Sequence, residues 1–158
     1  MEIVQEMVLI GAPVSRIAEE LRNLERFKDF MDNVEEIKIL HREADCQISS
    51  WKVNIDGIDL AWVEEDSFLL DRGYMSFKML EGDFDCFEGF WNLKPLSANS
   101  SQTDVELVVK YDLGLPSFDE IIGDVLRSKI VENSRALLHA LKRRAESNVD
   151  GKVAFEVV

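Results

Sequence analysis

Three carboxylic acids follow one another at Glu64, Glu65 and Asp66, just after Trp62 in a segment of alternating apolar residues. In a strand, Glu64 and Asp66 share a face with Trp62, and Glu65 lies on the opposite face. If that face lines an apolar cavity, loss of hydration raises the pKa of Glu64 and lets it exchange protons with a carbonyl or hydroxyl group. Glu64 is therefore the candidate catalytic residue. Strand ends also commonly carry solvated carboxylates, so that alternative stays open.

A second unusual segment is EGDFDCFEGFWNLKP, residues 81–95, which places several aromatic residues around a glycine. Alternation puts Phe87, Gly89 and Trp91 on one face and Phe84 and Cys86 on the other. A glycine inside a strand marks either a bend or a place where something else comes close. The pattern predicts a wall packed on both faces, with a curl or free space at Gly89.

The sequence gives little support for chemistry that depends on histidine, cysteine, a metal ion or a bound phosphate. His41 lies in a turn-like segment and His139 near the end of a helix, and we expect both to be exposed. Cys46 and Cys86 are far apart in sequence and are expected to be reduced, half-buried thiols. Metal-ligand spacing and a phosphate-binding glycine loop are absent from the sequence, so no metal and no cofactor are expected.

The composition limits the class of protein. A chain of 158 residues predicts one domain, which we place at residues 1–148, with a tail at 149–158. The net charge of −13 argues against binding nucleic acid. The sequence contains neither an apolar run long enough for a transmembrane segment nor a secretory signal, so a cytoplasmic location is expected.

The elements that would position these residues can be read from hydrophobic periodicity. A first strand at residues 2–10 is followed by two short helices, with a bend near Asn23. Six further strands are joined by short turns and are therefore antiparallel neighbours; they span about 34–41, 46–55, 58–70, 73–80, 83–94 and 102–113.

A long amphipathic helix of about eight turns is predicted after Pro116. Its apolar stripe consists of Phe118, Ile121, Ile122, Val125, Ile130, Leu137 and Leu141. This helix is the only predicted element long enough to cover one face of a curved sheet, so we expect the sheet to wrap around it. For the last residues, GKVAFEVV, a short strand and disorder both stay open.

Taken in order, five segments resemble the START-like (SRPBCC) superfamily, and more narrowly its polyketide cyclase/dehydrase (aromatase/cyclase) and coenzyme Q-binding-protein-like branch. The resemblance extends over about residues 3–146. The segments are VLIGAPVSRIAEELRNLERFKDFM, WKVNIDGIDLAWVEED, EGDFDCFEGFWNLKP, VELVVKYDLGLP and IVENSRALLHALKRRAE.

The resemblance implies an α+β helix-grip fold, in which a seven-stranded antiparallel sheet wraps around a long C-terminal helix and two short helices follow strand 1. It also implies a deep apolar cavity that accepts polyketides, isoprenoid quinones, sterols or lipids. The positions that match lining residues in the aromatase branch are Phe27, Met31, Trp62, Glu64, Phe87 and Trp91. Asn133, in the apolar stripe of the long helix, is expected either to contact the ligand or to bond neighbouring backbone.

Two positions depart from the family pattern. Polyketide-cyclising members tend to carry an arginine two residues beyond Glu64 and a tyrosine where the short helix ends, whereas this chain has Asp66 and Val34. An aldol cyclisation needs a cation or a hydrogen-bond donor near the developing enolate, and Asp66 cannot supply a cation. We keep Asp66 and Gly89 among the candidate ligand-binding residues.

Three hypotheses for function follow. The first is an aromatase/cyclase-like protein that folds a poly-β-keto chain for ring closure and dehydration, with Glu64 as acid/base group. The second is a non-catalytic carrier or chaperone of a quinone, isoprenoid or lipid. The third is a protein-binding module whose acidic face docks a basic partner, such as an acyl carrier or synthase domain.

Overall fold

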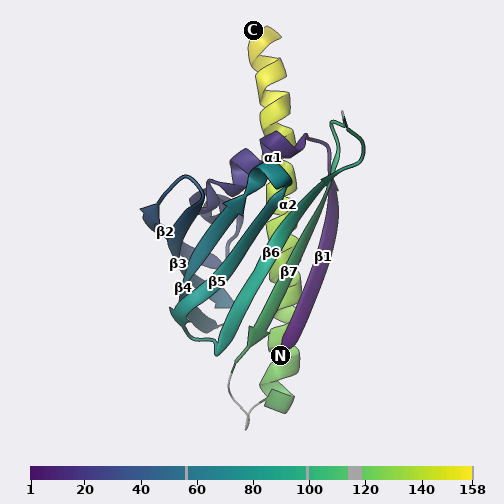
Figure 1. Cartoon of the computed structure of the whole chain (residues 1–158). Coiled ribbons are helices and arrows are strands. Elements are labelled where there is room, and N and C mark those ends of the chain that lie inside the picture. Colours follow the sequence, from purple (N-terminus) through teal and green to yellow (C-terminus); the bar gives the residue numbers. More distant parts are fainter. Residues whose placement is uncertain (56, 99, 114–118, 158) are drawn as a thin grey trace.

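Seven strands form one antiparallel sheet in the order β1-β7-β6-β5-β4-β3-β2 (Figure 1). This computed structural model describes the backbone of residues 1–55, 57–98, 100–113 and 119–157, and the side chains of 1–55, 57–98, 100–113 and 123–147. The strands are β1 (Glu2–Ile10), β2 (Val34–Arg42), β3 (Cys46–Ile55), β4 (Ile58–Leu69), β5 (Tyr74–Gly82), β6 (Cys86–Pro95) and β7 (Thr103–Asp112).

The helices follow the expected order along the chain. They are α1 (Val14–Leu21), the 3₁₀ helices η1 (Leu24–Phe30) and η2 (Leu70–Arg72), and α2 (Asp119–Val157). The two short helices after β1 are confirmed, although the second is a 3₁₀ helix. α2 runs on as far as Val157, through residues 149–157 of the predicted tail, so these residues are helical and do not form the short strand that the sequence allowed. The domain boundary at residue 148 stays a prediction.

The sheet curls around α2, which crosses its concave face (Figure 1). Arg127 and Arg135 of α2 form ion pairs with Glu2 and Glu6 of β1, and so hold the helix against one edge of the sheet. The predicted helix-grip architecture is confirmed. None of the helices in the described part of the chain is both long and apolar enough to cross a bilayer.

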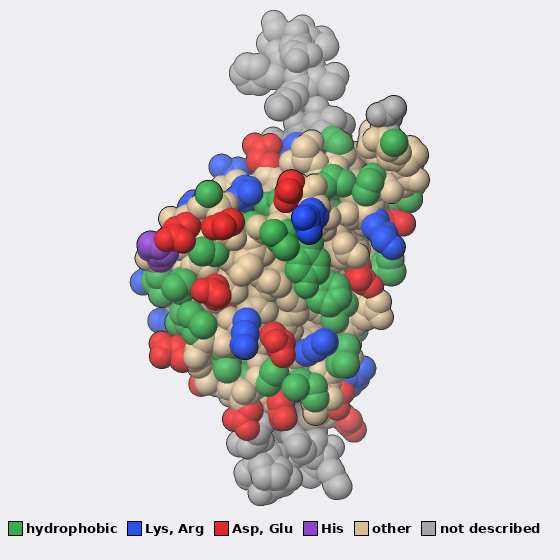
Figure 2. Space-filling model, viewed as in Figure 1, with side chains coloured by type: hydrophobic (Ala, Val, Ile, Leu, Met, Phe, Trp, Pro, Cys, Tyr) green, Lys and Arg blue, Asp and Glu red, His purple; other side chains and the backbone are tan. Residues whose placement is uncertain are grey.

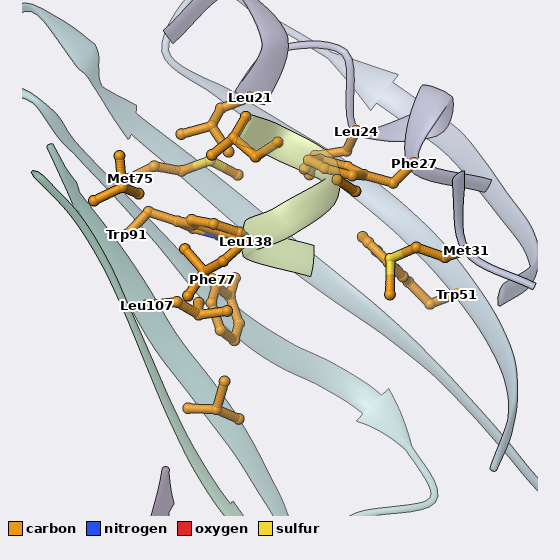
Figure 3. Packing of buried hydrophobic residues seen from close by; sticks show 14 of the residues in the cluster. Leu21, Leu24, Phe27, Met31, Trp51, Met75, Phe77, Trp91, Leu107 and Leu138 are labelled. Atoms are coloured by element: carbon orange, nitrogen blue, oxygen red, sulfur yellow. The ribbon is translucent and has the colours of Figure 1, made fainter. Parts of the chain in front are cut away.

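The main hydrophobic core lies between the concave face and α2. Figure 3 shows side chains from the sheet, including Met75, Phe77 and Trp91, converging on Leu138 of α2, with Leu21 and Leu24 entering from the short helices. Burial of these faces supplies the main driving force for folding, because apolar area is removed from water.

The buried stripe of α2 differs in part from the predicted one. Val125 is 51% exposed, whereas its neighbour Leu126 is 2% exposed. Ile130 and Leu141 of the predicted stripe are buried as expected, and Leu137 packs against the core. The buried positions follow steps of three and four residues, at Leu126, Ile130, Ser134, Leu138, Leu141 and Ala145. Phe118, Ile121 and Ile122 lie outside the residues with described side chains.

The outer face of the sheet carries acidic and basic side chains interspersed, with hydrophobic side chains between them (Figure 2). Tyr74 and Phe90 stack on each other on this side of β5 and β6, with ring centroids 5.5 Å apart. This face therefore has no continuous acidic patch in the described residues that would recognise a basic partner.

Candidate functional site

A cavity of about 70 Å³ lies between the inner face of the sheet and α2. Six aromatic side chains form much of its wall: Trp51, Trp62, Phe77, Phe84, Phe87 and Trp91. All three tryptophans of the protein are among them. Pockets that hold drug-sized ligands have volumes of roughly 300 Å³ or more, so a ring compound must move some of these side chains apart when it binds.

Aromatic side chains of the wall contact one another across four strands, β3 to β6. Trp51 and Trp62 are cross-strand partners that stack with their centroids 5.7 Å apart. Phe87 joins this cluster at 4.9 Å from Trp62 and 4.8 Å from Phe84. Stacked and tilted rings provide flat apolar surfaces, which suit a flat or greasy ligand.

Phe84 corrects one prediction. Alternation placed it on the face opposite Phe87, but Phe84 is buried and packs against Phe87 and Trp62. The reason is that β6 begins only at Cys86, so Phe84 belongs to the turn before the strand and does not follow its alternation.

Glu64 and Asp66 both point inward from β4. Their exposed fractions are 4% and 0%, whereas Glu65 between them is exposed. Leu60, Trp62 and Phe68 on the same face are also buried, so the two acids lie within an apolar row. The register between β4 and β5 shifts at Glu64, and such a bulge re-aims a side chain. The solvated alternative is therefore wrong for these two carboxyl groups.

Two residues of the neighbouring strand β3 donate hydrogen bonds to Asp66, and Trp62 of β4 itself donates one to Glu64. The Trp62 indole Nε1–H donates to Glu64 Oε1 at 2.7 Å. Ser49 Oγ donates to Asp66 Oδ2 at 2.8 Å, and Gln47 Nε2 donates to the same oxygen at 3.1 Å. The Glu64 and Asp66 carboxyl groups lie close enough for each to shift the pKa of the other.

Burial raises the pKa of Glu64 well above its ordinary value, and the neighbouring Asp66 carboxyl raises it further. The hydrogen bond from Trp62 acts in the opposite direction. Burial also raises the pKa of Asp66, although the hydrogen bonds from Glu64, Ser49 and Gln47 lower it. Glu64 can therefore remain protonated at a pH where an exposed glutamate is ionised.

The raised pKa values predict a pH-dependent stability. Between the ordinary pKa of a glutamate, about 4.3, and the folded-state pKa of Glu64, the native protein binds more protons than the unfolded chain. The free energy of unfolding must therefore fall as pH rises through this window. The contribution is about 1.4 kcal/mol for each unit by which the pKa is raised.

We expect Glu64→Gln to remove much of this dependence and to be more stable than the wild type on the alkaline side. Urea unfolding followed by circular dichroism at several pH values measures the effect. Glu65→Gln, on the exposed face of the same strand, is the matched control and should follow the wild type. Parallel curves for the wild type and Glu64→Gln would contradict the assignment.

A second, more polar hollow adjoins the cavity at one end of the sheet. It has a volume of about 220 Å³ and is lined by residues that include Asn33, Asn54, Lys129 and Asn133. Asn133 lines both the hollow and the inner cavity. Its Oδ1 accepts a hydrogen bond from Asn33 Nδ2 at 2.6 Å, which links α2 to the loop before β2. This pair of asparagines therefore stands where the cavity approaches the surface.

A family model described as polyketide cyclase / dehydrase and lipid transport matches residues 10–146. The chain belongs to this family. The polyketide cyclase/dehydrase assignment made from the sequence is confirmed by this match. A START superfamily protein from Mycobacterium smegmatis has a similar fold, with a TM-score of 0.63, 19% identity and coverage of 92% of this chain and 97% of that chain.

Two other solved structures are more similar. TTHA0849 from Thermus thermophilus is 28% identical, with a TM-score of 0.86 and coverage of 93% of this chain and 99% of that chain. The Zhui aromatase/cyclase from Streptomyces sp. R1128 is 19% identical, with a TM-score of 0.82 and coverage of 94% of this chain and 95% of that chain; at this identity the likeness concerns the fold. No curated protein sequence matches the chain.

Within this polyketide cyclase/dehydrase fold, the predicted site residues divide into two groups. Trp62, Glu64, Phe87, Trp91 and Asn133 line the cavity. The remaining four are not among its lining residues: Phe27 and Met31 are core side chains, Asp66 lies behind Glu64, and Gly89 is covered by Phe77. Asn133 bonds a side chain, not the neighbouring backbone.

Sequence reasoning missed the residues that β3 contributes. Gln47, Ser49 and Trp51 alternate along β3 and all face inward. The available signal was that two polar residues precede a tryptophan on one face of β3, just as two acids follow a tryptophan on the adjacent strand. Only the β3–β4 register brings Gln47 opposite Asp66 and Ser49 opposite Glu64.

A small acidic cluster lies away from the cavity, where the chain turns from β2 into β3. Its members are Glu43, Asp45 and Cys46, whose side-chain atoms that could bind a metal ion lie within 4.8 Å of one another. Glu43 and Asp45 are exposed, and the Cys46 thiol donates to Glu43. Cys46 and Cys86 are both free and half-buried, as predicted.

Membership of this family, together with the apolar cavity, supports a function in binding a hydrophobic small molecule.

Proposed function

We propose that this protein binds a linear poly-β-keto chain in the cavity between the sheet and α2, and promotes its ring closure and dehydration. The observation that carries the proposal is the position of Glu64. Among the described residues that line the cavity, Glu64 is the one with an ionisable side chain, and it lies between aromatic walls. An acid/base group in a dry, shaped cavity is what this chemistry requires.

Ring closure has three proton-dependent parts. A base removes a proton from a carbon between two carbonyls, the resulting enolate attacks a carbonyl carbon, and the new alkoxide takes up a proton. Dehydration then removes a second proton from carbon while the protonated hydroxyl leaves as water. Glu64 can accept a proton as a carboxylate and return it as a carboxylic acid, and the aromatic walls hold the chain in a folded conformation.

A carrier function is the second candidate, and one observation favours it. None of the described lining residues is a lysine or arginine, so no cation is placed to stabilise an enolate. In a carrier, Glu64 and Asn133 would instead hydrogen-bond the polar end of a quinone, isoprenoid or lipid. The predicted cytoplasmic location, and docking of an acyl carrier or synthase domain, remain predictions under either function.

The binding part of the proposal is tested by tryptophan fluorescence, because all three tryptophans line the cavity. A neutral hydroxyanthraquinone should quench this fluorescence in a saturable way. Ser134→Leu fills the cavity from α2, since Ser134 is a buried lining residue. We expect this variant to weaken the affinity at least about tenfold, or about 1.4 kcal/mol.

Ser128→Leu is the matched control, because Ser128 is exposed on the same helix, and its affinity should equal that of the wild type. Thermal unfolding by circular dichroism checks that Ser134→Leu is folded. Linear quenching without saturation, or equal affinities of both variants, would show that the ligand does not occupy this cavity.

Two measurements distinguish the cyclase function from the carrier function. Incubation with a synthetic poly-β-keto thioester, followed by mass spectrometry, detects loss of water above the rate without protein. Extraction of the purified protein with organic solvent identifies any molecule that it carries. An unchanged thioester together with an extracted quinone or lipid would favour the carrier function.

A further inference from the structure

One oxygen of the carboxyl pair on β4 lacks a hydrogen-bond donor. Glu64 Oε1 accepts from Trp62, and Asp66 Oδ2 accepts from both Ser49 and Gln47. Asp66 Oδ1 is fully buried and has no donor among the described residues when both acids are ionised. A buried acceptor without a donor is costly. A proton held between the two carboxyl groups would supply the missing hydrogen bond.

The surroundings of the pair do not compensate two negative charges. On the inner face, its sheet neighbours are Ser49 and Gln47 on β3 and Phe77 and Met79 on β5. All four are uncharged.

α2 contributes uncharged Asn133 and Ser134 to the cavity wall. The charged residues that act on the pair lie further out. Glu65 on the opposite face adds negative charge. Arg42 reaches only Gln47 Oε1, at 3.3 Å, and is itself paired with Glu25.

We propose that Glu64 and Asp66 retain a single proton as a pair. The cavity therefore binds uncharged ligands that bear a carbonyl or hydroxyl oxygen, and it rejects carboxylates. This inference rests on the proposed function. Like charges held side by side out of water do not both ionise, which is the behaviour of the paired aspartates in aspartic proteases. Asp66 does not line the cavity and acts through Glu64, so it is a positioning residue.

The ligand class follows from the charge of the pair. With one proton the pair carries one negative charge, and a carboxylate ligand would bring a second one into an apolar enclosure. A ketone or alcohol oxygen brings none, and it can accept the Glu64 proton as a hydrogen bond while Ser49 and Gln47 continue to hold Asp66. The pair should therefore bind neutral oxygenated ligands more tightly than fatty-acid-like ligands of the same size.

Isothermal titration calorimetry with three naphthalenes of the same substitution tests this selectivity. Acetylnaphthalene carries a carbonyl, naphthoate a carboxylate and ethylnaphthalene no oxygen. At about neutral pH we expect the ketone to bind most tightly and the carboxylate at least about 100-fold more weakly. In Glu64→Gln/Asp66→Asn, which keeps the shape without the charge, the carboxylate should gain at least about tenfold relative to the ketone. Glu65→Gln should leave the ratio unchanged.

The outcomes distinguish a failure of the proposed function from a failure of the shared proton. If none of the three compounds binds, the proposed function fails. If ketone and carboxylate bind equally well to the wild type, the cavity function stands and the shared proton is overturned.

Carbon-13 NMR of the carboxyl carbons measures the proton directly and needs no variant. At about neutral pH we expect the signals of Glu64 and Asp66 together to report one proton. Two ionised signals, or two protonated ones, would overturn the proposal. Asp66→Asn, if folded, should shift the midpoint of Glu64 titration to lower pH, which a merely structural role of Asp66 would not do.

Discussion

Replacing Glu64 with glutamine is expected to slow the proposed cyclisation by a factor of about 10²–10⁴ and to leave ligand affinity nearly unchanged. Glutamine has the same shape, and its side-chain oxygen can still accept the hydrogen bond from Trp62. It cannot take a proton from the ligand or return one. The loss should therefore appear in turnover and not in binding.

The measurement compares the rate of formation of the dehydrated ring product with the rate in the absence of protein, because poly-β-ketones also cyclise unaided. Tryptophan quenching gives the affinity of the same variant. Glu65→Gln, exposed on the other face of β4, should retain full activity. Equal rates for Glu64→Gln and the wild type would remove Glu64 from the chemistry.

Replacing Gly89 with alanine is expected to lower the free energy of unfolding by about 3 kcal/mol. A Cβ atom at this position would lie 2.0 Å from the carbonyl oxygen of Val108 and 2.6 Å from Cζ of Phe77. The carbonyl belongs to the backbone of the neighbouring strand and cannot rotate away. Strands β6 and β7 must therefore separate locally, which should lower the melting temperature by about 10 °C.

Two variants test this explanation. Gly57→Ala introduces a Cβ with no atom within 4 Å, although the backbone φ of +88° strains it, so its cost should be smaller, about 1–2 kcal/mol. Phe77→Leu/Gly89→Ala removes the ring contact but keeps the clash with Val108, so it should restore little of the lost stability. A melting temperature for Gly89→Ala within error of the wild type would contradict the close approach.

The same geometry bears on the role of Gly89, for which the sequence predicts either a curl of the strand or free space for a ligand. The Phe77 ring fills the position that a side chain at Gly89 would take, and the two strands approach too closely for any Cβ. Gly89 therefore permits the close approach of β6 to β7, and the free volume lies elsewhere, between the aromatic rings and α2.

The order of the elements could be predicted from the sequence because it depends on local properties. Alternation with short turns marks antiparallel neighbours, and a stripe at helical spacing marks a helix that must be covered. These rules predicted seven strands, two short helices and a long helix held by the sheet. They were less accurate for α2, where Val125 is exposed and Leu126 is buried, because adjacent apolar residues leave the direction of the stripe ambiguous.

The chemistry of the site depends on tertiary structure. Alternation placed Glu64 and Asp66 on one face of a strand but could not tell whether that face is wet or dry. Their burial depends on the curl of the sheet around α2, and their hydrogen-bond partners depend on the β3–β4 register that brings Ser49 and Gln47 alongside.

The sequence by itself therefore determined the fold and placed Glu64 and Asp66 on one face of a strand, since periodicity and turn chemistry act over a few residues. Only the tertiary structure decided that these acids form a buried pair beside a small aromatic cavity, and that Gly89 is a point of strand contact. The pKa of a carboxyl group depends on the water and dipoles around it, and these are supplied by residues distant in the chain.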